Sequence, residues 1–146
     1  MKKVLTLIFL SVALFANDII ISKSDYSVDE TIENIKTIVK AKGFGVFATI
    51  NHQENAKTVG MNLNESKVII FGNPKIGTLL MQEDMNIALD LPLRVLVYKD
   101  DKGDVNVSYR DGSWIKDHHF LHSDNLTNKV NVGMNKITDQ ARLKAE

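Results

Sequence analysis

The chain has 146 residues and no cysteine, and its 18 lysine and arginine residues balance 18 aspartate and glutamate residues. Without cysteine the protein has no disulfides, thiolate chemistry or thiolate metal ligands, so its fold depends on core packing. Its near-neutral charge gives no field that would attract nucleic acid or anionic lipid, so we expect neither as a partner.

Residues 1–16 have the three zones of a secretory signal peptide. Two lysines are followed by a mostly apolar segment at 4–15 and by the small residue Ala16. The apolar segment is shorter than the roughly 20 residues that span a bilayer, which favours a cleaved signal over a permanent anchor. We therefore predict a periplasmic or secreted protein in which residues 17–146 form one domain and no membrane anchor remains.

An amphipathic helix at about 28–42 is the most distinctive predicted element. Ser27 and Glu30 have the S-x-x-E spacing of a capping box, in which each side chain accepts a hydrogen bond from the backbone N–H of the other residue. Apolar residues then recur at helical spacing, and Gly43 can adopt the left-handed conformation that ends a helix.

Short runs of β-branched and aromatic residues alternate with turn residues along the rest of the chain, which predicts strands. The polar loop at 100–104 indicates a hairpin, and apolar residues spaced three or four apart predict a closing helix. This order favours a two-layer α+β fold, with an antiparallel sheet and helices on one face, over a doubly wound parallel fold. The predicted strands are 18–22, 45–51, 67–71, 93–99 and 105–109, and the predicted helices are about 28–42, 75–81, 114–120 and 126–143.

The segment 71–78 combines a strand end, a turn and a helix start, where free backbone N–H groups can bind an anion. It lacks the G-K-[ST] ending of a phosphate loop and the glycine spacing of a dinucleotide fingerprint, so a plain strand-to-helix connection is the simpler interpretation. Met81 could line a site for a soft metal or a flat apolar ligand, or fill the core. Tyr109 and Trp114 could seal a core edge or form the floor of a ligand cleft.

Three histidines, His118, His119 and His122, lie close together in the sequence. If their segment is helical, His118 and His122 share a face and could bind one metal ion, whereas His119 points elsewhere. The segment lacks an H-E-x-x-H motif, so solvated surface histidines are an equal alternative. The predicted metal ligands are His118 and His122.

His52 follows a predicted strand, and Asp90 is a charged residue among apolar neighbours. Together they could act as a general acid and a general base. The alternatives are an exposed loop residue for His52 and, for Asp90, a carboxylate that caps a turn near Pro92. Because no serine, cysteine or lysine nucleophile stands in an activating motif, the sequence indicates no particular reaction, and it leaves the cofactor unknown.

Several ordered motifs within 46–120 closely resemble the family catalogued as domain of unknown function 302, DUF302. The resemblance implies a β-α-β(4)-α domain similar to the two-layer TATA-binding-protein-like fold, without DNA binding and without an established activity. One departure is Asp111-Gly112-Ser113, where family members often have Asp-Pro before the tryptophan-bearing helix. The motifs are FATINH at 47–52, IFGNPKIGTLLM at 70–81, ALDLPL at 88–93 and VSY at 107–109, followed by Trp114.

The family pattern also implies which positions to consider first as a site, and they are His52, Asn73, Gly77, Thr78, Met81, Asp90, Tyr109, Trp114 and His118. Our leading hypothesis is an exported protein that binds a small ligand or a metal ion in a cleft near 73–81. The alternatives are a small acid/base enzyme that uses His52 with Asp90, and a structural or oligomeric interaction module such as a homodimer. Convergence of His52, Met81, Asp90 and His118 on one cavity would favour a binding site, whereas dispersal would favour structural roles.

Overall fold

The structure is a computed structural model that describes residues 19–122 and 124–144. The predicted signal peptide at 1–16 lies outside the described residues and stays a prediction. Within the described ranges, every helix is too short or too polar to span a bilayer.

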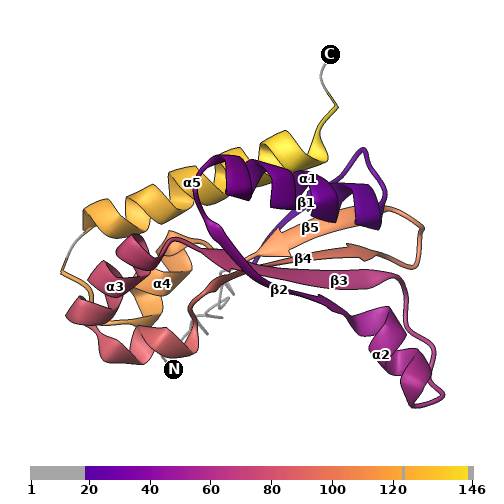
Figure 1. Ribbon diagram of the computed structural model, residues 1–146, viewed down its shortest axis with the longest axis horizontal. Coiled ribbons are helices and arrows are strands. Elements are labelled where there is room, and N and C mark those ends of the chain that lie inside the picture. The colour runs from indigo at the N-terminus through magenta and orange to yellow at the C-terminus, as the bar shows by residue number, and fades with distance from the viewer. Residues whose placement is uncertain (1–18, 123, 145–146) are drawn as a thin grey trace, which may run out of the picture.

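The described strands form one five-stranded antiparallel sheet in the order β1-β5-β4-β3-β2 (Figure 1). The first strand in the sequence therefore pairs with the last one, at one edge of the sheet. Gly103, with φ at +86°, lies in the turn between β4 and β5, as the predicted hairpin requires. The strands are β1 (Ile20–Lys23), β2 (Gly45–Asn51), β3 (Ser66–Gly72), β4 (Leu93–Lys99) and β5 (Val105–Tyr109).

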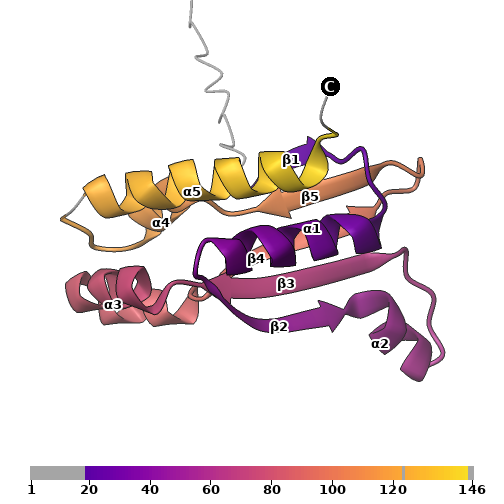
Figure 2. The same ribbon diagram turned by 45° about the horizontal axis from the view of Figure 1, so that its top comes forward.

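Two long helices, α1 and α5, lie side by side on one face of the sheet (Figures 1 and 2). The helices α3 and α4 lie at one end of the sheet, and α2 lies at the other end (Figure 1). The predicted two-layer α+β fold is confirmed, with short helices added between the strands. The helices are α1 (Val28–Ala41), α2 (His52–Thr58), α3 (Pro74–Glu83), the 3₁₀ helix η1 (Met85–Leu89), α4 (Gly112–His118) and α5 (Asp124–Arg142).

The capping box predicted for α1 is present. The hydroxyl of Ser27 accepts a hydrogen bond from the backbone N–H of Glu30, and the backbone N–H of Ser27 donates to Glu30 Oε2 at 3.0 Å. One face of the helix is then buried against the sheet and α5. The core also contains Ile69 and Phe71 of β3, Val95 and Val97 of β4, and Met134 and Ile137 of α5.

Two helices were not expected from the sequence, and a third, α4, begins and ends two residues earlier than expected. The helix α2 buries no residue, so it has no amphipathic pattern, and η1 spans only five residues. The side chain of Asn51 starts α2 by accepting a hydrogen bond from the N–H of Glu54. The helix α4 ends at His118 rather than near residue 120, because the backbone of His119 is extended.

Candidate functional site

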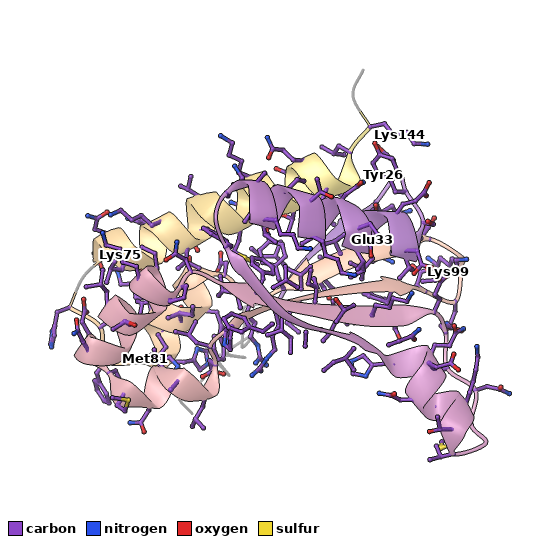
Figure 3. The ribbon with its side chains drawn as sticks, viewed as in Figure 1. Tyr26, Glu33, Lys75, Met81, Lys99 and Lys144 are labelled. Carbon is purple, nitrogen blue, oxygen red and sulfur yellow. The ribbon has the colours of Figure 1, made fainter. Side chains whose placement is uncertain are left out.

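A cavity of about 620 Å³ lies between α3, η1 and α5, where β3 runs into α3. Figure 3 shows Lys75 and Met81 on α3 at this end of the molecule. We call it the main cavity. Its lining includes four of the predicted ligand-binding residues, which are Asn73, Gly77, Thr78 and Met81.

The sequence builds one wall of the main cavity through a local turn. Strand β3 ends at Gly72, and Asn73 caps α3 by accepting hydrogen bonds from the N–H groups of Lys75 at 3.0 Å and Ile76 at 3.4 Å. Pro74, at the first helical position, has no N–H to satisfy. The N–H groups at the start of α3 are thus bonded within the chain, which leaves few of them to bind an anion.

Two glycines keep the main cavity open. Gly77 of α3 and Gly133 of α5 both line it, and neither has a positive φ, so the backbone does not require glycine at these positions. A Cβ at Gly77 would lie 3.8 Å from Leu91 Cδ1, and a Cβ at Gly133 would have no atom within 4 Å. Glycine inside a helix costs about 0.5–1 kcal/mol relative to alanine. The two helices are therefore less stable than they would be with alanine, at the positions where a side chain would enter the cavity.

The lining of the main cavity is mostly apolar. Phe44, Phe47, Leu91 and Met134 are among its apolar residues, and Lys129 of α5 is the one charged residue among the lining residues. Lys129 is exposed, and no ion pair found within residues 19–122 and 124–144 includes it. A large apolar pocket with few polar groups is typical of a small-molecule site.

A second, smaller pocket of about 210 Å³ contains three more of the predicted ligand-binding residues, Asp90, Tyr109 and Trp114, whereas His52 lines neither pocket. Arg94 and Arg110 also line it, and Leu93 lines both pockets. The hydroxyl of Tyr109 donates to Asn135 Oδ1 of α5 at 2.7 Å, so Tyr109 seals the edge of the core. Burial raises the pKa of the Tyr109 hydroxyl. The predicted single site is therefore divided between two neighbouring pockets.

His119, which sequence reasoning did not select, is the partner of Asp90. Its Nε2 lies 2.9 Å from Asp90 Oδ2, its Nδ1 lies 3.5 Å from Asp84 Oδ2, and its side chain is only 7% exposed. Asp84 and Asp90 bracket η1, so one imidazole ties both ends of this helix to the loop after α4. The sequence pattern shows no signal for this contact, because the three residues come from different elements.

Asp84 receives two backbone hydrogen bonds. The N–H of Asn86 donates to it at 2.9 Å and the N–H of Phe120 at 3.1 Å. These two N–H groups, with Asn86 as the larger cause, hold the pKa of Asp84 below its usual range. A carboxylate with a lowered pKa in the folded state stabilises the fold above its unfolded pKa, and this contribution is lost as pH falls through the folded pKa.

We predict that replacing Asp84 by asparagine reduces stability near neutral pH and that the difference from wild type shrinks on acidification. Urea unfolding measured between about pH 6 and pH 3 should show the two free energies of unfolding converging below about pH 4. Asp117→Asn is the matched control, because Asp117 is exposed on α4 and has no hydrogen bond or ion pair in the described ranges. A pH-independent difference for Asp84→Asn would contradict the prediction.

The model of the family described as Domain of unknown function DUF302 matches residues 20–141. The chain belongs to the DUF302 family. The match extends beyond the motifs at 46–120 that suggested it, and it includes α1 and most of α5.

Two curated relatives are named fluoride-specific ion channel FluC 1, one from Brucella suis and one from Brucella abortus. Each is 38% identical to this chain over 121 residues, which is 82% of the chain and 48% or 45% of the relative. The DUF302 chain thus spans about half the length of the curated relatives it matches, and their name describes those longer proteins.

A crystal structure of an uncharacterised conserved DUF302 protein from Bacillus stearothermophilus is similar in fold. The TM-score is 0.70 at 17% sequence identity, and the similarity covers 87% of this chain and 97% of the other. This comparison supports the α+β architecture and carries no information on a ligand.

The helical spacing that suggested a metal site at His118 and His122 is absent from this DUF302 chain. The helix α4 ends at His118, so His122 lies beyond it and the shared helical face does not exist. The His118 ring stacks on Trp114 with 4.3 Å between ring centroids, and its Nδ1 lies 2.8 Å from the Trp114 carbonyl oxygen. Within the described residues, no three histidine or acidic side chains are placed to hold a metal ion.

His52 and Asp90 lie at opposite ends of the sheet. Asn51, next to His52, pairs with Lys67 at the start of β3, whereas Phe71 at the end of β3 pairs with Leu93 near Asp90. At roughly 3.3 Å per residue, that length of β3 separates the two ends by about 13 Å. The proposed acid/base pair is therefore not assembled, and His52 lines neither pocket.

Proposed function

We propose that this DUF302 protein is exported and binds an apolar small molecule, or one with an anionic head group, in the main cavity. Support for export comes from the three zones of residues 1–16. The observation that carries the binding proposal is an apolar cavity of about 620 Å³ that two helix-interior glycines leave open.

The chemistry of the lining selects the class of ligand. The volume lies within the range of about 300–1,000 Å³ that is usual for small-molecule pockets. The lining residues include no histidine, aspartate or glutamate, so an apolar ligand suits the main cavity better than a metal ion does. Lys129 supplies one positive charge at the surface of α5, which would favour the carboxylate of a single-chain fatty acid over a neutral analogue.

Displacement of a fluorescent apolar dye by laurate, measured on purified protein, tests the proposal. Gly133→Leu places a side chain in the cavity and should weaken laurate binding about tenfold or more, because displacing two methylene groups costs about 1.6 kcal/mol. Val132→Leu is the matched control: it adds volume at the neighbouring position of the same helix, where the side chain is 68% exposed. It should leave binding unchanged.

Two outcomes would overturn the proposal. The first is that laurate does not displace the dye from the wild-type protein and native mass spectrometry detects no bound apolar molecule. This result would rule out a binding site of this class. Equal laurate affinity in Gly133→Leu and Val132→Leu would rule out the main cavity as its location. Circular dichroism on each variant confirms that a loss of binding is not a loss of folding.

The two alternative functions stand differently. The acid/base enzyme is not carried forward, because His52 and Asp90 are separated by the length of β3. The oligomeric interaction module, with a homodimer as its simplest form, stays a prediction.

A further inference from the structure

Two arginines, Arg94 and Arg110, line the smaller pocket. Val95 of β4 pairs with Tyr109, the last residue of β5, and Arg94 and Arg110 are the residues next to this last pair. Both arginines line the same pocket of about 210 Å³. Two positive charges that line one small pocket repel each other, so the fold bears an electrostatic cost at this position.

Neither guanidinium is neutralised by a carboxylate in the described part of the chain. Arg94 Nη2 donates to the carbonyl oxygen of Leu89 at 3.3 Å, and the Arg110 guanidinium lies over the Trp114 ring at 4.4 Å from its centroid. No ion pair among the described residues includes either arginine. Since each guanidinium has five N–H donors, most of them remain free to bind a ligand or water.

The nearby acidic groups are engaged elsewhere. Asp90, which lines the pocket, is held by His119 Nε2 at 2.9 Å. Asp111, next to Arg110 in sequence, caps α4 through Oδ1, which accepts from the N–H groups of Ser113 at 2.9 Å and Trp114 at 3.1 Å. The lining therefore has two guanidinium groups against one carboxylate, and that carboxylate already has a partner.

Trp114 holds the Arg110 guanidinium in a defined orientation. The guanidinium group is planar, so it can stack on the face of an indole while its N–H groups stay exposed at its edge. Such a fork matches the two oxygens of a carboxylate or phosphate, which it can bind through two parallel hydrogen bonds. The ring of His118, which also stacks on Trp114, further restrains the indole.

We propose that the pocket bounded by Arg94, Arg110 and Trp114 binds a small oxyanion, the carboxylate or phosphate group of a small molecule. The two guanidinium groups provide the charge, and the pocket volume limits the ligand to a small one. The proposal does not rest on the main cavity, because the two pockets share only Leu93 and the apolar lining of the main cavity is not involved.

Trp114 is the single tryptophan of the chain, so its fluorescence reports directly on this pocket. We expect sodium phosphate or sodium benzoate to change the tryptophan emission of the wild-type protein along a saturable curve. Sodium chloride at equal ionic strength should produce no saturable change in emission. Saturation by phosphate alone would identify a phosphate ligand, and saturation by benzoate would identify a carboxylate ligand. Each of these two results supports the proposal.

Arg94→Gln and Arg110→Gln should each weaken binding about tenfold or more, because each removes hydrogen bonds between charged groups. Isothermal titration calorimetry gives a second measure that does not depend on the indole environment. Lys136→Gln is the control: it removes a positive charge from an exposed position on α5 outside both pockets. Its affinity should match that of wild type.

A change in emission that chloride reproduces, or wild-type affinity in both arginine variants, would overturn the proposal. If a glutamine variant does not fold, Arg94→Lys and Arg110→Lys provide the test, because lysine keeps the charge and loses the planar fork. Binding in these lysine variants should lie between that of wild type and complete loss. Undiminished binding in both would also overturn the proposal.

Discussion

Replacing Gly112 by alanine is expected to lower the free energy of unfolding by about 3 kcal/mol, the upper end of the usual cost of overpacking. A Cβ at Gly112 would overlap the carbonyl oxygen of Thr127 and lie 2.9 Å from Asn131 Oδ1. Because the Thr127 oxygen belongs to the backbone of α5, it cannot move aside as the end of a flexible side chain could. The helices α4 and α5 would have to separate.

Urea unfolding followed by circular dichroism measures this effect. Gly133→Ala is the matched control, since it makes the same substitution in α5 at a position where no atom lies within 4 Å of the new Cβ. We expect the control to be slightly more stable than wild type. A Gly112→Ala variant as stable as wild type would show that α4 and α5 do not approach each other at this point.

Gly112 illustrates a contact between distant segments that sequence patterns do not reveal. Gly112 is visible in the sequence, but the contact that excludes a Cβ there is with α5, which follows in the chain. By contrast, α1 and β4 follow the predicted ranges closely, because each buries one face and burial imposes a periodic pattern. The helix α2, which buries no residue, has no such pattern.

The candidate site was predictable to the extent that it is local. Asn73, Gly77, Thr78 and Met81 belong to one strand-to-helix turn, so a single motif gathers them. The opposite wall, with Lys129 and Gly133, comes from α5, and no local pattern joins it to that turn. The contact between His119 and Asp90 was missed for the same reason.

The separation of His52 from Asp90 could have been predicted from the expected meander. Antiparallel pairing of β2 with β3 and of β3 with β4 places the end of β2 and the start of β4 at opposite ends of the sheet. His52 follows β2, and Asp90 precedes β4. A shared site for the two was therefore incompatible with the very fold that the sequence indicated.

The double variant Gly77→Ala/Gly133→Ala should be more stable than wild type by about 1–2 kcal/mol, since each substitution removes the cost of a helix-interior glycine and the effects of separate sites add. Both positions accept a Cβ without a close contact, with 3.8 Å to Leu91 Cδ1 as the shortest distance. Thermal and urea unfolding measure the gain.

The same variant should bind laurate more weakly than wild type, because both new methyl groups enter the main cavity. A gain in stability coupled to a loss of binding is the result expected if the two glycines are retained for a ligand, since folding alone would favour alanine at both positions. A gain in stability with unchanged laurate affinity would instead mean that the cavity tolerates both methyl groups and that the glycines do not serve this ligand class.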